Sequence, residues 1–193
     1  MGNVEGGRAN DIMYTPRSGL EMEAATLHKA PILMYSDLCK EAARYGSARM
    51  LSRMFKRSDQ NIILLQDPDD MDSGHWISVS RNVPKKEVYF FSTYGKKPDV
   101  EKLKWMTDSM LRASGQSINI FNDGMKEFQR HGWTIYYNDY PYQKEGDNTS
   151  TCGIYTAAFL RSGVDPDEFE LQTKEIMDRG ENPAIVYYDK YFR

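Results

Sequence analysis

Short apolar runs and helix-like segments alternate along this chain, and their spacing predicts a mixed architecture. Strands are predicted where β-branched, aliphatic or aromatic residues cluster between turn signals, at residues 61–65, 75–80, 87–92 and 133–137. Helices are predicted where apolar positions recur at helical spacing, over residues 36–54, 99–113, 151–161 and 167–179. Because the strands are few and helices are interspersed among them, the pattern indicates an α+β fold with a small mixed sheet flanked by helices.

Residues that begin or interrupt secondary structure set several boundaries of these elements. Ser36 can cap the first predicted helix, and Gly46 should interrupt or weaken it. Residues 81–86 are typical of a loop that joins the second and third strands into a hairpin. Gly163 should end the helix that begins at or just after Cys152.

The length of the chain favours one domain. With 193 residues, of which 40% are hydrophobic and 27% charged, the chain can bury one core and is short for two. Residues 1–18 are rich in Gly, Asn, Arg and Ser, with Pro16 near their end, so we expect them to form a loosely ordered N-terminal extension. Residues 1–193 are therefore interpreted as a single domain.

Charge and hydropathy argue against some classes of partner. A formal net charge of -3 and a pI near 5.7 give no global electrostatic reason to bind nucleic acid or an anionic membrane. No apolar stretch approaches the ~20 residues needed to span a bilayer, and the first residues lack the pattern of a signal peptide. We therefore expect a soluble, intracellular protein that makes no membrane contact.

The two cysteines, Cys39 and Cys152, differ in their chemical setting. Their number fits a reducing compartment and does not by itself make a metal site. Cys152 precedes Gly153 and a helix-prone segment, so it can lie at a helix N-terminus, where free N–H groups lower a thiol pKa. An unpaired cysteine is, however, more often a small buried apolar group than a nucleophile. Cys39 has no histidine in its sequence context and is expected to be packed.

His75 is the candidate base for the Cys152 thiol. It lies between Gly74 and Trp76 at the start of a predicted strand, from which it can project into a cleft. On position alone, a surface or capping histidine is the alternative interpretation. His131 lacks a following hairpin and His28 lies in a weakly patterned stretch, so both are interpreted as structural or surface residues.

Short motifs in this chain resemble those of one group of cysteine peptidases. They are Gly-His-Trp-Ile-Ser-Val at 74–79, Val-Tyr-Phe-Phe-Ser-Thr-Tyr-Gly at 88–95, Tyr-Gln at 142–143 and Thr-Cys-Gly-Ile-Tyr at 151–155. In these motifs, and in the chain order of His, Gln and Cys, the sequence resembles the adenovirus-protease (adenain) and SUMO-protease superfamily. The resemblance spans roughly residues 62–161 and implies an adenain/SUMO-protease-like fold.

The resemblance implies roles for individual residues. His75 matches the general base and Cys152 the nucleophile. Gln143 matches the glutamine whose side-chain amide helps to form the oxyanion hole. Trp76 and Gly153 match the residues that follow the base and the nucleophile, and we expect both to contact substrate.

The segment before Cys152 carries two further expectations. Tyr142 ends an aromatic stretch that begins at Trp133. Packing is the simpler interpretation of this stretch; as part of a substrate groove, Tyr142 would be a substrate-binding residue. Nine residues separate Gln143 from Cys152, a longer gap than is usual in the family, which predicts a small loop insertion at residues 145–148.

Ser92 departs from the family pattern. An Asp, Glu or Asn is expected seventeen residues after the histidine, and this chain has a serine there. A hydroxyl can accept a hydrogen bond from the imidazole Nδ1–H, but it cannot stabilise an imidazolium by charge. We therefore expect Ser92, or a carboxylate from elsewhere such as Asp99 or Glu87, to assist a working Cys–His pair.

The resemblance implies peptide-bond hydrolysis through a thioester, without a metal or an organic cofactor. The compact length is similar to that of the viral branch, whose members trim capsid or core precursors during virion maturation. The expected partner of this monomer is then a precursor polypeptide, with an activating peptide or nucleic acid as an optional addition. Its expected location is the host cytoplasm or nucleus, and the virion.

Two alternatives to this function remain. A protease of SUMO or another ubiquitin-like modifier would share the site and differ in substrate. A catalytically silent domain of the same fold would use the cleft only to hold peptides, and Ser92 is the best support for it.

Overall fold

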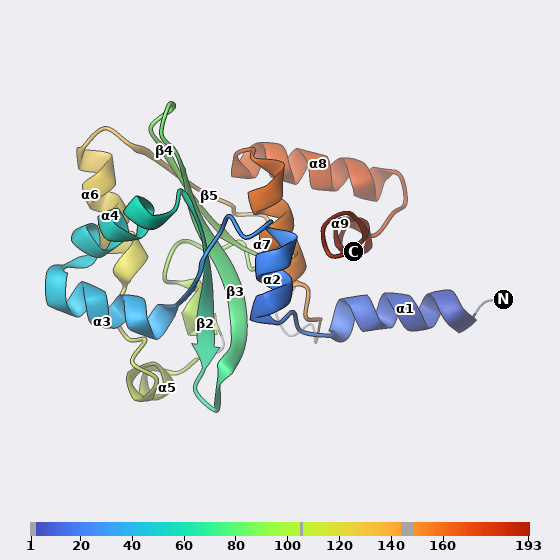
Figure 1. The fold of residues 1–193 in the computed structure, drawn as a ribbon, viewed down its shortest axis with the longest axis horizontal. Coiled ribbons are helices and arrows are strands. Elements are labelled where there is room, and N and C mark those ends of the chain that lie inside the picture. The colour runs from blue at the N-terminus through green and yellow to red at the C-terminus, as the bar shows by residue number, and fades with distance from the viewer. Residues whose placement is uncertain (1–2, 105, 144–148) are drawn as a thin grey trace.

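A mixed five-stranded sheet lies at the centre of the protein (Figure 1). The computed structural model describes residues 3–104, 106–143 and 149–193. The strands follow the order β1 (Ile32–Met34), β2 (Gln60–Asp67), β3 (Asp70–Asn82), β4 (Glu87–Ser92) and β5 (Thr134–Tyr137). The two outer pairs, β1 with β2 and β4 with β5, are parallel. The two inner pairs, β2 with β3 and β3 with β4, are antiparallel. The sheet and its flanking helices confirm the predicted α+β class.

Helices cover both faces of the sheet (Figure 1). One face packs against α3 (Tyr35–Tyr45), α4 (Ser47–Arg57) and α6 (Ile120–Arg130). The other packs against α2 (Gly19–Ala25), α7 (Cys152–Ser162), α8 (Pro166–Asp178) and α9 (Pro183–Tyr191). Two further helices are α1 (Asn3–Tyr14) and α5 (Asp108–Ala113). No helix in the described ranges is long and apolar enough to cross a membrane.

Alternate residues of β2 pack into two separate hydrophobic cores, one on each face of the sheet. Ile62 and Leu64 pack in the cluster that contains α7, whereas Ile63 and Leu65 pack in the cluster that contains α3 and α4. A strand that is covered on both faces gains from apolar residues at every position, which is why this segment is a continuous apolar run in the sequence.

The register of β3 and β4 brings two candidate residues onto one face. Ile77 lies opposite Ser92 in the ladder. His75 precedes Ile77 by two positions, so its side chain points to the same face and lies diagonally across from Ser92. The predicted hairpin of these strands is confirmed, with β3 extending further on both sides than the predicted 75–80.

Two predicted helices are each broken into shorter ones. The segment 36–54 forms α3 and α4, which are separated at Gly46, where φ is 86°. The break at Gly46 confirms the predicted interruption. The segment 99–113 forms a 3-10 turn at Glu101–Lys104 and then α5, which begins at Asp108 after Thr107, whose side chain accepts a hydrogen bond from Met110 N–H. Apolar spacing does not detect this second break, where the backbone leaves helical geometry before the cap.

The C-terminal helices agree with the predictions. α7 begins at Cys152, and Gly163 ends it in a left-handed conformation with φ of 69°. α8 begins at Pro166, after Asp165 accepts a hydrogen bond from Glu168 N–H.

The N-terminal segment is more structured than its composition indicates. Residues 3–14 form α1, instead of the loose extension expected over residues 1–18. Residues 13–17, here termed the N-terminal strap, pass over the loop that precedes Cys152, where Ser150 N–H donates to the Met13 carbonyl at 2.7 Å. Arg17 is only 6% exposed. These contacts come from residues far along the chain, and local composition therefore gives no sign of them.

Candidate active site

A cleft of about 350 Å³ joins the start of α7 to the middle of β3. Cys152, His75 and Gln143, three of the residues predicted from the sequence, all line it. The other lining residues are Pro16, Arg17, Asp67, Ser73, Gly74, Trp76, Tyr94, Thr149 and Ser150. The structure thus brings Cys152 into the same cleft as His75, which precedes it by 77 positions in the chain.

The imidazole of His75 is held on two sides. Its Nε2 lies 3.1 Å from Ser92 Oγ, and its ring stacks on that of Tyr94 with centroids 4.3 Å apart and an 18° interplanar angle. The sequence predicted that Nδ1 makes the contact with Ser92, whereas in the structure Nε2 makes it. Nδ1 is therefore the ring nitrogen that is left for another partner.

Glycine is required immediately before His75. Gly74 has φ of 147°, and a Cβ there would lie 1.9 Å from the Leu65 carbonyl oxygen. Any side chain would push β3 away from β2 at the point where Leu65 pairs with His75. The residue therefore fixes the position of the imidazole through the backbone.

Ser92 is fixed by an asparagine that the sequence analysis missed. Asn138 Oδ1 accepts from Ser92 N–H at 2.9 Å, and Asn138 Nδ2 donates to the Ser92 carbonyl at 2.7 Å. This side chain acts as a strand partner just beyond the last pair of the β4–β5 ladder, Phe90 with Tyr137. Both residues are buried.

Among the described residues, neither Asp99 nor Glu87 takes the place of the missing acid. Asp99 accepts instead from the Tyr35 hydroxyl at 2.5 Å and from Asn122 N–H at 2.7 Å. Glu87 lies at the far end of β4 and accepts from the Tyr89 hydroxyl. The suggestion that either one orients His75 is therefore wrong, and among the described residues the imidazole meets a hydroxyl there.

Cys152 occupies the predicted helix N-terminus. Its thiolate form is favoured by the backbone N–H groups of Trp76, Gly153 and Cys152 itself, but burial has the larger effect and raises the pKa of the thiol above its usual value. The Thr156 hydroxyl, one turn later, donates to the Trp76 carbonyl at 3.2 Å. This bond ties α7 to β3 beside both candidate residues.

The amide of Gln143 is positioned by both neighbouring segments. Its Oε1 accepts from the Thr93 hydroxyl at 3.2 Å, and its Nε2 donates to the Thr149 carbonyl at 2.5 Å. An amide nitrogen carries two hydrogens, so one remains for a ligand in the cleft. The loop insertion predicted at residues 145–148 lies outside the described residues.

The three residues predicted to contact substrate have different surroundings. Trp76 lines the cleft, and its indole N–H donates to the Arg17 carbonyl at 3.0 Å. A Cβ on Gly153 would lie 2.9 Å from Arg17 Cβ and 3.0 Å from Met22 Sδ, so glycine serves packing there rather than substrate approach. Tyr142 packs against aromatic rings, namely those of Phe91, Tyr140, Tyr155 and Phe169, and is not among the described residues that line the cleft.

Arg17 connects the strap to the C-terminal helix. Its Nε donates to the Thr15 carbonyl at 2.9 Å, and its guanidinium carbon lies 5.2 Å from the centre of the Tyr188 ring. Its side chain therefore holds the strap in a fixed path beside the thiol. The sequence signal for this role is absent, because an arginine in a Gly-rich segment is ordinarily exposed.

The remaining histidines and the second cysteine lie elsewhere. His131 is on the surface, where its Nδ1 lies 2.8 Å from the Glu127 carbonyl, and His28 is exposed. Cys39 is buried, and burial raises the pKa of its thiol to about 11. In the described part of the chain, no three His, Cys, Asp or Glu side chains are arranged to hold a metal ion.

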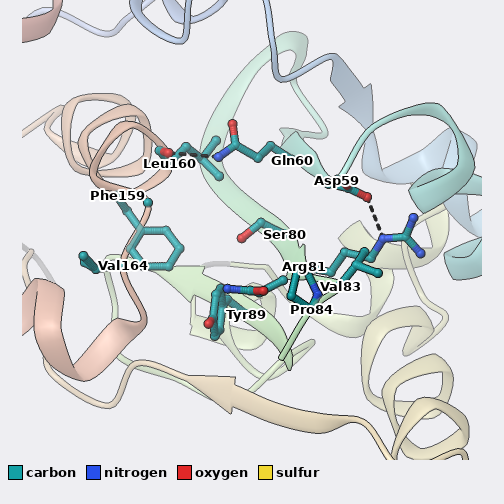
Figure 2. Close-up of a pocket in the computed structure, with 12 residues that line it drawn as sticks. Asp59, Gln60, Ser80, Arg81, Val83, Pro84, Tyr89, Phe159, Leu160 and Val164 are labelled. Carbon is teal, nitrogen blue, oxygen red and sulfur yellow. Dashed lines mark hydrogen bonds and ion pairs between the residues drawn. The ribbon is translucent and has the colours of Figure 1, made fainter. Parts of the chain in front are cut away.

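A second hollow, of about 230 Å³, lies at the opposite end of α7 (Figure 2). Figure 2 shows the Ser80 hydroxyl directed into it and Asp59 paired with Arg81, whose Nε lies 2.6 Å from Asp59 Oδ1. The described residues that line it include no histidine and no cysteine, and its carboxylate, Asp59, is paired with Arg81. The first cleft is therefore the better candidate for a site with a nucleophile and a base.

Burial of His75 predicts a pH-dependent stability. Burial lowers the pKa of His75 to about 3 from the ordinary 6.5. Between these values the unfolded chain binds more protons, so the free energy of unfolding should fall as the pH drops from about 6.5 toward 3, by up to ~1.4 kcal/mol per pH unit. Urea unfolding across this range measures the slope. Glutamine does not titrate, so His75→Gln should reduce the slope of the free energy of unfolding against pH by the contribution of one proton. An unaltered slope would contradict a buried, neutral imidazole.

No family model and no curated protein matches this sequence. Among solved structures, the chain is similar to the SUMO protease Ulp1 with its catalytic cysteine oxidised to a sulfinic acid, at 16% identity and a TM-score of 0.37, over 88% of this chain and 74% of that one. It is also similar to the C-terminal Ulp1 protease domain in complex with Smt3, the yeast ortholog of SUMO, at 15% identity and a TM-score of 0.39, over 92% and 79% of the two chains. Similarity at this level carries no inference about activity, so the chemistry has to come from the residues of the cleft.

Proposed function

We propose that this protein is a cysteine peptidase in which Cys152 is the nucleophile and His75 the base. The observation that carries the proposal is the shared cleft, which is lined by a thiol at a helix N-terminus, a positioned imidazole and a held amide. Nucleophilic catalysis on a carbonyl requires these three groups: an attacking sulfur, a base, and donors for the oxyanion.

The reaction begins with a neutral pair. Burial disfavours both the thiolate of Cys152 and the imidazolium of His75, so the thiol proton passes to Nδ1 as sulfur attacks the carbonyl carbon. The Nε2–H then donates to Ser92 Oγ, which fixes the tautomer that leaves Nδ1 free to accept. Stacking on Tyr94 limits rotation of the ring, and its π-face favours the positive charge that develops.

The tetrahedral intermediate is stabilised by two donors, the Cys152 backbone N–H and the free hydrogen of the Gln143 amide. The C–N bond then breaks, His75 returns its proton to the departing amine, and a thioester remains on Cys152. Water, deprotonated by His75, attacks the thioester; the acid leaves and the thiol is restored. Every step uses groups of the chain itself.

The proposed substrate is a protein. The motifs resemble those of peptidases that trim viral capsid or core precursors, and we propose such a precursor as substrate, with modifier fusions of the SUMO type as the alternative. An extended peptide is consistent with the cleft, which lies beside β3 and has two lining side chains held in place, Trp76 by Arg17 of the strap and His75 by Tyr94.

Alkylation of the two cysteines tests whether Cys152 is a nucleophile. The protein is treated with iodoacetamide at pH 7, and the modification of each cysteine is followed by mass spectrometry. Cys152 should react at least ~10-fold faster than Cys39, because Cys152 lines the cleft together with His75, which can take its proton, whereas Cys39 lies in the core on the other face of the sheet and its thiol pKa is raised to about 11. Equal rates would favour the catalytically silent peptide-binding domain, for which Ser92 and the lowered pKa of His75 are the supporting observations.

The same preparation identifies the substrate class. It is incubated with candidate capsid-precursor polypeptides and with fusions of a ubiquitin-like modifier, and the products are mapped by mass spectrometry. Cleavage of precursors alone supports the maturation role, whereas cleavage of modifier fusions alone would replace that role with the alternative.

A further inference from the structure

Helix α4 and the end of α3 carry a positive charge that the rest of the protein does not share. The chain as a whole has a net charge of -3, yet residues 40–57 contain six Lys or Arg and one acidic residue, Glu41. Lys40 pairs with Asp37, and Arg53 with Glu41. Within the described residues, the other four cations of this segment have no carboxylate partner, namely Arg44, Arg49, Lys56 and Arg57.

Three arginines of this segment lie close to the exposed ring of Tyr45. The guanidinium carbons of Arg44, Arg53 and Arg49 lie 5.1, 5.2 and 5.6 Å from the centre of the Tyr45 ring. Each cation is attracted to the ring, but three like charges so close together repel one another. The carboxylate of Glu41 offsets only the charge of Arg53. A carboxylate that reaches Arg44 and Arg49 would relieve this repulsion and accept paired hydrogen bonds.

A hollow of about 260 Å³ runs beside the arginines. It is lined by Ala48 and Ser52 of α4 together with Phe128, His131 and Trp133. Residues four apart lie on the same side of a helix. Ala48 and Ser52 therefore share one side of α4, and Arg49 and Arg53, here termed the arginine row, share the side next to it. Glu127 also lines the hollow, but it is paired with Arg130.

We propose that this face of α4 binds an acidic peptide segment that inserts one apolar side chain into the hollow. Arg44 and Arg49, which have no carboxylate partner among the described residues, would receive carboxylates of the segment beside that residue. A peptide is favoured over a nucleic acid because the aromatic and small residues that line the hollow suit an aliphatic or aromatic side chain, and because the basic surface is confined to α4 and the end of α3. α4 packs on the sheet face opposite α7, so the segment and a ligand of the cleft can bind together.

Fluorescence anisotropy with a labelled peptide tests the site without reference to peptidase activity. The probe is a peptide of Glu and Asp residues around one Leu, and the comparison probe has Gly in place of the Leu. We expect the full chain to bind the Leu peptide more tightly at low salt than at high salt. Arg44→Gln with Arg49→Gln should weaken this binding at least ~10-fold, the size of two lost charge-assisted contacts.

Two variants separate the arginine row from the hollow. Lys29→Gln with Lys85→Gln makes the same charge change at exposed positions elsewhere and should alter the dissociation constant less than ~2-fold. Ala48→Leu fills the hollow and should lower the affinity for the Leu peptide to that for the Gly peptide. Any of three results would overturn the proposal. They are unchanged binding after the Arg44 and Arg49 substitutions, equal affinity for the Leu and Gly peptides, and tighter binding of a single-stranded oligonucleotide of equal charge.

Discussion

Replacing Cys152 by alanine is expected to abolish peptide hydrolysis, lowering kcat/KM by at least ~10⁴. His75→Ala should cost about as much, because a buried thiol whose pKa is raised needs an adjacent base to lose its proton. The double variant should be no slower than either single variant, since the two groups act as one unit. Hydrolysis of the fastest-cleaved substrate, followed under kcat/KM conditions, measures all three.

Cys39→Ala is the matched control for these losses. It removes the other thiol, which lies against the Ile118 carbonyl on the opposite face of the sheet and makes no contact with the cleft. Its kcat/KM should stay within ~3-fold of the parent even though a buried methyl-sized group is lost from the core. Hydrolysis that survives Cys152→Ala but not Cys39→Ala would refute the assignment of the nucleophile.

Ser92→Asp is expected to raise kcat/KM by roughly 10- to 100-fold, a fraction of the ~10⁴ that an acidic orienter supplies in a serine triad. The serine hydroxyl is 3.1 Å from His75 Nε2, so a carboxylate on the same strand position would face the same ring edge. The negative charge would favour the imidazolium and raise the pKa of His75 from about 3, which in turn favours the thiolate of Cys152. The rate of iodoacetamide alkylation should rise in parallel.

The neutral isostere Ser92→Asn separates charge from shape. Asparagine fills the same volume and can accept from Nε2–H, but it carries no charge, so we expect it to change kcat/KM less than ~5-fold from the parent. If the asparagine and aspartate variants gained equally, the benefit would come from packing, and the account of the missing charge would fail. Folding of both variants is checked by urea unfolding, since Ser92 is fully buried.

Local signals in the sequence are sufficient to locate helix α7. Cys152 stands where a glycine-containing, apolar segment begins, and Gly163 ends it, so both limits of α7 depend on nearby residues. The same holds for the β3–β4 hairpin, whose register put His75 and Ser92 on one face. Where the structure depends on residues close in sequence, the sequence predicts it.

Residues that act through distant partners could not be found in this way. Asn138 meets Ser92 across 46 positions, and Arg17 meets Trp76 across 59. Neither side chain stands in a motif, and each is of a type that is usually exposed. Tyr94, by contrast, is two residues after Ser92 on the same segment, and its position near the predicted base was a signal that could have been used.

Helix α6 was missed for a different reason. Its apolar positions, Ile120, Phe121, Met125 and Phe128, do follow helical spacing, but Gly124 interrupts them and Asn119 makes no capping bond. The glycine is there because a Cβ would come 3.0 Å from the Ser47 carbonyl oxygen of α4. Close helix packing thus removed the local signal that would have identified the helix.

The contact between Arg17 and Tyr188 also bears on when the protein becomes competent during synthesis. One wall of the cleft contains Arg17, whose guanidinium lies over the ring of Tyr188, a residue that is translated after both Cys152 and His75. On the ribosome, Cys152 and His75 will therefore emerge before the wall beside them is anchored. We expect the cleft of a nascent chain to stay incomplete until α9 has left the exit tunnel.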